Sequence, residues 1–427
     1  MATPSPPRLA RALRHRNYRL FVFGQSISLV GTWLTRFATT WMAYRLTGSA
    51  FVLGLVAFCG HAPTSLVAPI AGVFIDRWDR HRVLVITQVA AMLQSAALAV
   101  FALTGWMTVW HLLVLGAVQG VINGFDMPAR QSFVRRMIDD PADLPNAIAL
   151  NSSMVNIAKL LGPVIAAALV GLVGEGWCFA IDSASYIAVV ASLLAMQVPK
   201  ESRRAANGKV LADLRDGVRY VRSVPLVRSL LLLLVCSAIL GGPYMSLLPI
   251  VAAEHLGGGP YTLGILMGAG GTGALAGALF LANRTTVVGL GDIVGRCALV
   301  LGAGLVALEL ASRVWLAAPI LFVVGAALMI QMASTNTLIQ TIVDQDKLGR
   351  VMSLYAVAFA GGMPLGAFLQ GSLASRIGAI HTFATAGVLC VVFALRYLRT
   401  LPRLGDGVAF VSCSDTPDAR CPARPKR

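Results

Sequence analysis

The sequence predicts an all-α membrane protein with twelve transmembrane helices, arranged as two six-helix bundles related by pseudo-symmetry. Three observations support this fold class: the composition, a series of long apolar runs, and the distribution of basic residues between those runs. Of the 427 residues, 57% are hydrophobic and only 13% are charged, whereas soluble domains carry about 25% charged residues. This composition excludes an ordinary soluble enzyme, and it excludes a disordered or secreted chain as well.

Twelve apolar runs are long enough to cross a bilayer, because a hydrocarbon core of about 30 Å takes about 20 helical residues. They are too long and continuous for the strands of a membrane barrel, which alternate in segments of about 10 residues. The first run follows basic residues, but it is too long for a signal peptide and lacks a clean small-residue cleavage site, so we expect it to be retained. The predicted spans are 20–44, 51–75, 83–104, 109–127, 146–172, 177–198, 227–252, 261–282, 291–311, 314–336, 350–374 and 379–400.

The basic residues between the spans orient the chain. Twelve spans place both termini on one side, and 30 of the 35 Lys and Arg residues then fall on that side. The opposite side has only Arg45, Arg313 and Arg376, while Arg36 and Lys159 lie inside spans. Loops rich in Lys and Arg stay in the cytoplasm, so we expect a multi-pass protein of the plasma (bacterial inner) membrane with both termini cytoplasmic. The net charge of +16 is therefore a topology signal, and we expect no nucleic-acid partner.

A polar stretch at 199–225 divides the chain into two halves. Its apolar residues recur at helical spacing between charges, which favours an amphipathic helix on the cytoplasmic face of the membrane; a plain linker is the alternative. These apolar residues are Leu211, Leu214, Val218 and Val221. We expect a first bundle at 1–198, this central loop at 199–225, a second bundle at 226–402 and a cytoplasmic tail at 403–427.

The two halves resemble each other at a nearly constant offset. A shift of 204 residues places Leu144 on Leu348 and Gly162 on Gly366. Each match is weak alone because Leu and Gly are abundant, but their common order indicates an internal duplication. Two six-helix repeats are typical of secondary transporters that bind their substrate at the repeat interface, near the middle of the membrane.

The loop between the second and third predicted spans carries a motif. It reads Gly72-Val-Phe-Ile-Asp76-Arg77-Trp-Asp79-Arg80-His81-Arg82-Val-Leu84. This resembles the signature G-x-x-x-D-R-x-G-R-K-x-x-L of the major facilitator superfamily, with Asp79 in place of the second glycine and His81 in place of the lysine. The resemblance implies a gate on the cytoplasmic side, and a solvated cluster of charges is the alternative.

The resemblance also implies roles within this gate. Gly72 would permit a close helix approach, and Asp76 would face the N-terminus of a helix beginning near Arg350, where the helix dipole favours an anion. Arg80 would pair with Asp126 at the cytoplasmic end of the fourth span. Such a latch holds one access state and breaks in the other.

Further segments resemble the branch of the superfamily that contains the enterobactin and macrolide exporters. These segments are 31–34, 128–131, 146–152, 156–163, 350–355 and 364–366, and the resemblance runs from about residue 15 to 402. The Gly162-Pro163 pair also resembles the antiporter motif GxxxGPxxGG, although alanines replace its other glycines. Close helix packing is an equally good explanation of that pair.

Four of the ionisable residues inside predicted spans are candidates for function, because a charge there is costly and usually faces a cavity or a partner. Arg36 is a candidate for substrate binding, with a snorkelling arginine near the outer interface as the alternative. Lys159 could bind an anionic substrate group or hold a carboxylate of another helix. Asp182 and Glu309 are candidates for proton exchange if they are buried, and are ordinary if they lie at the interface. Uncharged candidates for the wall of a substrate cavity are Gln119, Asn151, Asn156 and Gln331.

These observations favour a monomeric secondary transporter that exports small amphiphilic molecules by proton antiport through alternating access. An importer or flippase of a metabolite or lipid on the same fold is the alternative. A non-transporting membrane sensor or an integral enzyme lacks support, because the sequence has no catalytic triad and its six His and seven Cys residues show no metal-binding spacing. We expect the lipid bilayer, a small-molecule substrate and H⁺ as partners, with no cofactor and no metal.

Overall fold

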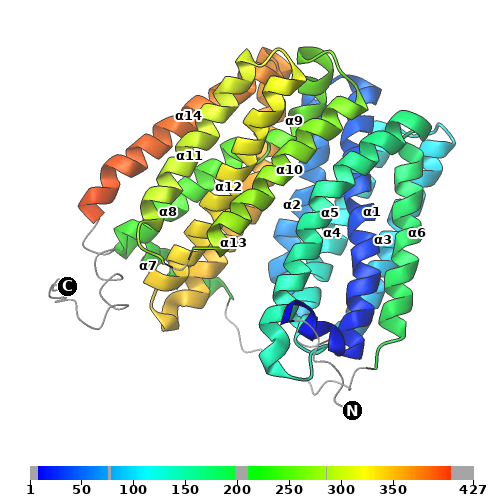
Figure 1. The fold of residues 1–427 in the computed structure, drawn as a ribbon, viewed down its shortest axis with the longest axis horizontal. Helices are drawn as coiled ribbons and strands as arrows, with labels where there is room; N and C mark the ends of the chain where they lie inside the picture. The colour runs from blue at the N-terminus through cyan, green and yellow to red at the C-terminus, as the bar shows by residue number, and fades with distance from the viewer. Residues whose placement is uncertain (1–7, 76–77, 198–209, 285, 405–427) are drawn as a thin grey trace. The chain divides into compact units, whose positions relative to one another are not determined.

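A computed structural model of the chain describes residues 8–75, 78–197, 210–284 and 286–404. Throughout these ranges the secondary structure is helical, and no strand is formed (Figure 1). The helices of the first half are η1 (Arg8–Arg14), α1 (Arg16–Thr47), α2 (Ala50–Ile75), α3 (Arg80–Leu103), α4 (Val109–Val134), η2 (Pro141–Asp143), α5 (Leu144–Val173) and α6 (Glu175–Leu194). Those that follow are α7 (Val210–Ser223), α8 (Pro225–Cys236), η3 (Ser237–Gly241), α9 (Tyr244–Ile250), η4 (Val251–His255), α10 (Pro260–Ala282), α11 (Leu290–Ala307), η5 (Leu308–Leu310), α12 (Val314–Ile342), α13 (Gln345–Ile377), α14 (Ala379–Thr400) and η6 (Leu401–Leu404).

Eleven helical segments of the described residues are long and apolar enough to cross a membrane. They coincide with the predicted spans from the second to the twelfth, and the segment from α8 to η4 counts as one of them. Helix α1 covers the first predicted span with 32 residues but is not among the eleven. It carries Arg36 and four threonines between positions 32 and 40, which lower its hydropathy. A count of twelve spans is therefore not confirmed.

The chain divides into two compact units, each described here by itself. Unit 1 comprises residues 1–208 together with 246–268, and unit 2 comprises 209–245 together with 269–427. The main division falls within the predicted central loop, while the short segment 246–268 is grouped with unit 1. The predicted tail at 403–427 lies almost entirely outside the described residues.

Helix α1 organises the packing of unit 1, where it contacts both α5 and α6. Helices α1 and α5 run parallel and in register, because Tyr18 donates a hydrogen bond to the Ala147 carbonyl at 2.6 Å and Trp33 contacts Gly162 with the same sequence separation. A Cβ atom at Gly162 would overlap that of Trp33. The Gly162-Pro163 pair therefore lies at a close helix crossing, as the packing explanation of this motif requires.

Helix α11 organises the packing of unit 2, where it contacts α12 and α14. Helix α7 lies within the predicted amphipathic stretch and packs against α13 and α8. Asp216 on α7 pairs with Arg350 on α13 at 3.4 Å, and a Cβ at Gly217 would lie 3.1 Å from the Arg350 carbonyl oxygen. The amphipathic helix thus has a protein partner, and its contact with the membrane stays a prediction.

One predicted span, 227–252, is an interrupted helix. Between α8 and α9 the chain forms the wide turn η3, and Gly242 and Pro243 follow it. Such a turn shifts the usual backbone hydrogen bonds, and unpaired carbonyls inside a membrane cost several kcal/mol each. The buried Gln370 of α13 relieves this cost, because its Nε2 donates to the carbonyls of Ile239 at 3.0 Å and Leu240 at 2.7 Å.

A glycine pair at the crossing of α11 and α14 gives a test of the packing in unit 2. A Cβ at Gly302 would lie 2.6 Å from the carbonyl oxygen of Gly387, whereas a Cβ at Gly361 would meet no atom within 4 Å. We expect Gly302→Ala to destabilise the protein by about 1–3 kcal/mol through overpacking, and Gly361→Ala to leave its stability unchanged or slightly raised. Thermal unfolding followed by size-exclusion chromatography in detergent measures both. Equal midpoints would contradict the described crossing.

Candidate functional site

The predicted gate is only partly described. Asp76 and Arg77 lie outside the described residues, so their roles stay predictions. The close helix approach expected at Gly72 is not seen among the described residues, since a Cβ there would meet no atom within 4 Å. Asp79 serves as the N-cap of α3 by accepting hydrogen bonds from the backbone N–H groups of His81 and Arg82. A glycine at this motif position would lack that cap.

The expected pairing of Arg80 with Asp126 stays a prediction. In the structure Asp126 is 4% exposed and pairs with Arg130, one turn further along α4. The Asp126 carboxylate also accepts hydrogen bonds from Thr87 Oγ1 at 3.0 Å and Gln88 Nε2 at 2.7 Å, both on α3. A partner four residues away on the same helix is brought into reach by helix geometry alone. That partner leaves Asp126 fully engaged in joining α3 to α4.

Asp182 is buried at the junction of three helices of unit 1. It lies on α6 with 3% of its surface exposed, and its Oδ2 accepts hydrogen bonds from Thr35 on α1 at 2.8 Å and from Ser95 on α3 at 3.0 Å. Its other oxygen, Oδ1, has no partner. A Cβ at Gly31 of α1 would lie 2.7 Å from this Oδ1, so a glycine is needed there for α1 to lie against the carboxylate.

The two basic residues predicted inside spans lie near one another in unit 1. Arg36 of α1 and Lys159 of α5 lie three residues to either side of the Trp33–Gly162 contact, and His61 lies in the middle of α2. The Arg36 guanidinium lies over the Trp33 ring, 4.9 Å from its centroid. Both Arg36 and His61 are exposed, and Lys159 is half-buried. Sequence reasoning missed His61, because a lone histidine in an apolar run gives no signal without the helices that surround it.

The remaining predicted candidates make local contacts. Gln119 donates to Asn123 at 3.1 Å, and Asn156 donates to the Ser152 carbonyl at 2.9 Å, each within its own helix. Asn151 is half-buried. Glu309 lies in the turn η5, where it is 37% exposed and pairs with His381 at 2.9 Å. Glu309 is thus partly exposed and ion-paired, whereas Asp182 is buried.

A small apolar pocket lies in unit 2 beside the interrupted helix. Its lining includes Ser237 and Gly242 from the interruption, with Met332, Phe359 and Met363 from α12 and α13. The predicted residue Gln331 lies next to this wall and donates from Nε2 to Ser237 Oγ at 2.6 Å. Because Gln331 is fully buried, it holds the interrupted helix against α12 and has no free surface for a ligand. Among the described residues, no group of His, Cys, Asp or Glu is arranged to hold a metal ion.

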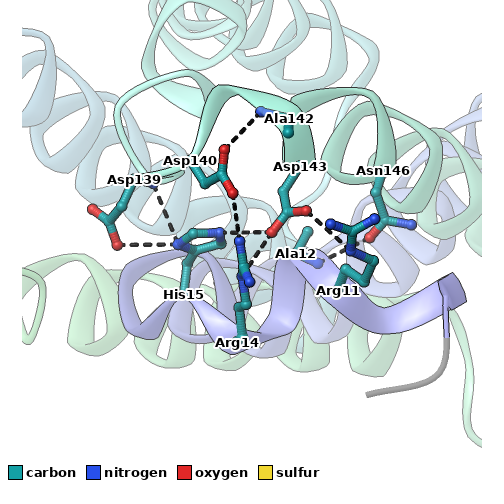
Figure 2. Close-up of polar contacts among 9 residues, drawn as sticks. All are labelled: Arg11, Ala12, Arg14, His15, Asp139, Asp140, Ala142, Asp143 and Asn146. Carbon is teal, nitrogen blue, oxygen red and sulfur yellow. Dashed lines mark hydrogen bonds and ion pairs between the residues drawn. The ribbon is translucent and has the colours of Figure 1, made fainter. Parts of the chain in front are cut away.

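A polar network that the sequence did not predict ties the start of the chain to the turn between α4 and α5 (Figure 2). At its centre is Asp143, which is 1% exposed and contacts three cationic or titratable side chains. Arg14 Nε lies 2.8 Å, His15 Nε2 3.1 Å and Arg11 Nε 3.4 Å from its carboxylate oxygens. Asp139 and Asp140 flank this centre by contacting His15 and Arg14 at 3.0 and 2.7 Å. We call these six residues the N-terminal clasp.

The contacts of the N-terminal clasp change the pKa of one of its acids, Asp140. The pKa of Asp140 lies below its ordinary value, first because the Ala142 N–H donates to the carboxylate and then because Arg14 pairs with it. A carboxyl group with a lowered pKa contributes stability above its unfolded pKa of about 4 and loses that contribution as the pH falls further. The ionised Asp140 therefore contributes to the stability of the N-terminal clasp at neutral pH, and this contribution is lost in acid.

Replacing the central acid should release the start of the chain. In Asp143→Asn the side chains of Arg11, Arg14 and His15 lose their shared carboxylate partner. Leaving a buried polar group without its partner costs about 1–3 kcal/mol, which here weakens the attachment of the N-terminal segment. We expect trypsin to cut after Arg11 and Arg14 about tenfold faster than in the unchanged protein. The matched control is Asp139→Asn, whose carboxylate is 87% exposed and contacts only His15 among these cations. Equal cutting rates in both variants would refute the central role of Asp143.

Comparisons with known proteins agree with this architecture. The family model described as transmembrane secretion effector matches residues 9–418. The chain is similar to macrolide efflux protein A of Streptococcus pyogenes, with 23% identity over 397 residues that cover 90% of this chain and 96% of the relative. It is also similar to the multidrug efflux pump Tap of Mycolicibacterium fortuitum, with 25% identity over 375 residues, covering 85% of this chain and 90% of that protein.

A solved structure gives the same fold. The crystal structure of a POT family transporter in complex with 5-aminolevulinic acid matches with a TM-score of 0.74 and 11% identity, covering 91% of this chain and 96% of that one. A likeness at this identity concerns the fold alone. The predicted resemblance to the major facilitator superfamily is thus confirmed, and the protein is a multi-pass membrane transporter without enzymatic activity. The chain belongs to the transmembrane secretion effector family of the major facilitator superfamily.

Proposed function

We propose that this protein exports small amphiphilic molecules from the cytoplasm in exchange for protons, by alternating access. The two relatives described above are named as efflux proteins for macrolides and for multiple drugs, which supports export as the direction. The distribution of basic residues supports a plasma-membrane location with both termini in the cytoplasm. The motif at 72–84 remains the proposed gate, and the protein is proposed to act as a monomer.

The observation that carries the proton coupling is the position of Asp182. This carboxylate is buried in α6, about 10 Å from the start of that helix at 1.5 Å per residue. Acids inside membrane spans are costly, and they commonly mark proton pathways. No basic residue pairs with Asp182 in the described part of the chain, so no fixed positive charge holds it permanently ionised.

The partners of Asp182 suit a group that gains and loses a proton. Thr35 and Ser95 carry hydroxyl groups, which donate to a carboxylate and accept from a carboxylic acid. The partnerless Oδ1 offers a place for the proton. Both protonation states can thus be accommodated without breaking the packing, whereas an arginine partner would favour only the ionised state.

The same geometry links protonation to helix packing. Thr35 and Gly31 bring α1 into direct contact with Asp182, and Ser95 brings in α3. A change in the charge of Asp182 therefore acts on the contact between α1 and α6, which is the most extensive helix contact of α1. Glu309, the other acid predicted for this role, lies exposed in a turn and offers no such link. We therefore assign the coupling role to Asp182 alone.

Inverted membrane vesicles test the direction and the coupling together. With an inside-acid pH gradient, we expect the unchanged protein to accumulate the neutral fluorescent amphiphile N-phenyl-1-naphthylamine. Asp182→Asn should lower this gradient-driven accumulation about tenfold or more, because it removes the group that exchanges the proton. Exchange of labelled for unlabelled N-phenyl-1-naphthylamine at equal pH should persist in that variant, since it requires substrate movement without net proton transfer.

Glu309→Gln is the matched control, because it neutralises an acid of unit 2 that lies in an exposed turn. We expect it to transport at the rate of the unchanged protein. Accumulation only in right-side-out vesicles would favour the alternative, an importer or flippase. Unchanged gradient-driven transport in Asp182→Asn would remove Asp182 from the coupling mechanism.

A further inference from the structure

Three cationic or titratable side chains lie near the middle of three different helices of unit 1. Lys159 lies 15 residues from the start of α5 and 14 from its end, and His61 lies 11 residues from the start of α2. Arg36 lies 11 residues, about 16 Å, before the end of α1. This depth argues against the snorkelling alternative, in which Arg36 would lie near the end of the helix and extend to the outer interface. We call Arg36, His61 and Lys159 the cationic trio.

The packing of α1 on α5 fixes two members of the cationic trio. Trp33 and Gly162 meet at the crossing of these parallel helices. Arg36 follows Trp33 by three residues, and Lys159 precedes Gly162 by three, so the two side chains flank one crossing. The Trp33 ring supports the Arg36 guanidinium at 4.9 Å, a cation–π contact that leaves its N–H donors available.

His61 presents one ring nitrogen to this region. Its Nδ1 lies 2.9 Å from the Ala57 carbonyl oxygen, one turn earlier on α2. A carbonyl only accepts, so Nδ1 carries a hydrogen and Nε2 is left for another partner. The ring is exposed.

The acids of unit 1 do not neutralise the cationic trio. The carboxylates that are buried there are each engaged elsewhere: Asp126 with Arg130, Asp143 within the N-terminal clasp, Glu175 with Arg45 at 2.8 Å, and Asp182 with two hydroxyl groups. Among the described residues, no carboxylate lies within ion-pair distance of Arg36 or Lys159. The trio thus repels itself in a region where uncompensated charge is costly.

From this juxtaposition we propose that the cationic trio is a binding site for the anionic group of an amphiphilic organic substrate, a carboxylate or sulfonate attached to an apolar body. The proposal rests on the transport function proposed above and names the substrate class. Arg36 supplies a planar donor fork that matches such an anion, and Lys159 adds a second charge. Trp33 and the apolar side chains of the spans suit the body of the ligand, which distinguishes it from a small hydrated ion.

Binding of matched probes to the purified protein in nanodiscs tests this class. The anionic probe is 8-anilinonaphthalene-1-sulfonate, and the neutral probe is N-phenyl-1-naphthylamine, which has the same rings without the sulfonate. Fluorescence is measured after subtraction of empty nanodiscs. We expect the double variant Arg36→Gln, Lys159→Gln to raise the Kd of the anionic probe about tenfold or more. The Kd of the neutral probe should stay within about twofold.

Further binding measurements distinguish the loss of positive charge from a loss of folding. The cationic amphiphile ethidium should bind more tightly to the double variant than to the unchanged protein, a gain that a misfolded protein would not show. Lys159→Arg should retain the anionic probe. Arg376→Gln removes one exposed positive charge at the end of α13, in unit 2, and should change none of the three affinities.

Each result bears on one claim. Equal loss of all three probes, or an unchanged Kd for the anionic probe, would overturn the proposed anion site. These measurements use no gradient, so they stand apart from the proton antiport. An intact anion preference together with absent gradient-driven transport would instead refute the proposed function, and would leave the binding site standing.

Discussion

The structure of unit 1 depends on how closely α1 lies against its neighbours. Small residues permit this contact: Gly162 receives Trp33 on the side of α5, and Gly31 faces Asp182 on the side of α6. In a membrane, where lipid is as apolar as the side chains, helices associate mainly through such close packing and through shared hydrogen bonds. Both proposed sites follow from this single arrangement, because α1 encloses the buried acid on one side and carries Arg36 on another.

A second constraint is that polar groups inside an apolar structure need partners. The acids of unit 1 show three solutions: an arginine for Asp126, a set of cationic side chains for Asp143, and hydroxyl groups for Asp182. Only the hydroxyl solution leaves a carboxylate free to change its charge. In unit 2 the same constraint explains Gln370, whose amide serves the carbonyls exposed by the interrupted helix. We therefore assign function to the buried or charged groups that lack a full set of hydrogen-bond or ion-pair partners.

Two segments outside the predicted spans, the start of the described chain and α7, show charged residues that stabilise the structure. The N-terminal clasp gathers basic residues around one buried acid, and α7 joins α13 through Asp216 and Arg350. Both lie in segments that the sequence marked only as basic or amphipathic. The basic residues that orient the chain therefore have a second role, because several of them also fasten the segments between the spans.

The sequence by itself determined eleven of the helical spans, the family and the position of Arg36 and Lys159 inside spans, because hydropathy and local motifs are properties of neighbouring residues. It named Asp182 and Glu309 as equal candidates, and it paired Asp126 with Arg80. Only the tertiary structure distinguished the buried Asp182 from the exposed Glu309, and showed Asp126 paired with Arg130. The physical reason is that burial and charge compensation depend on which helix faces meet. That choice is made by contacts between residues far apart in the chain, which no local pattern records.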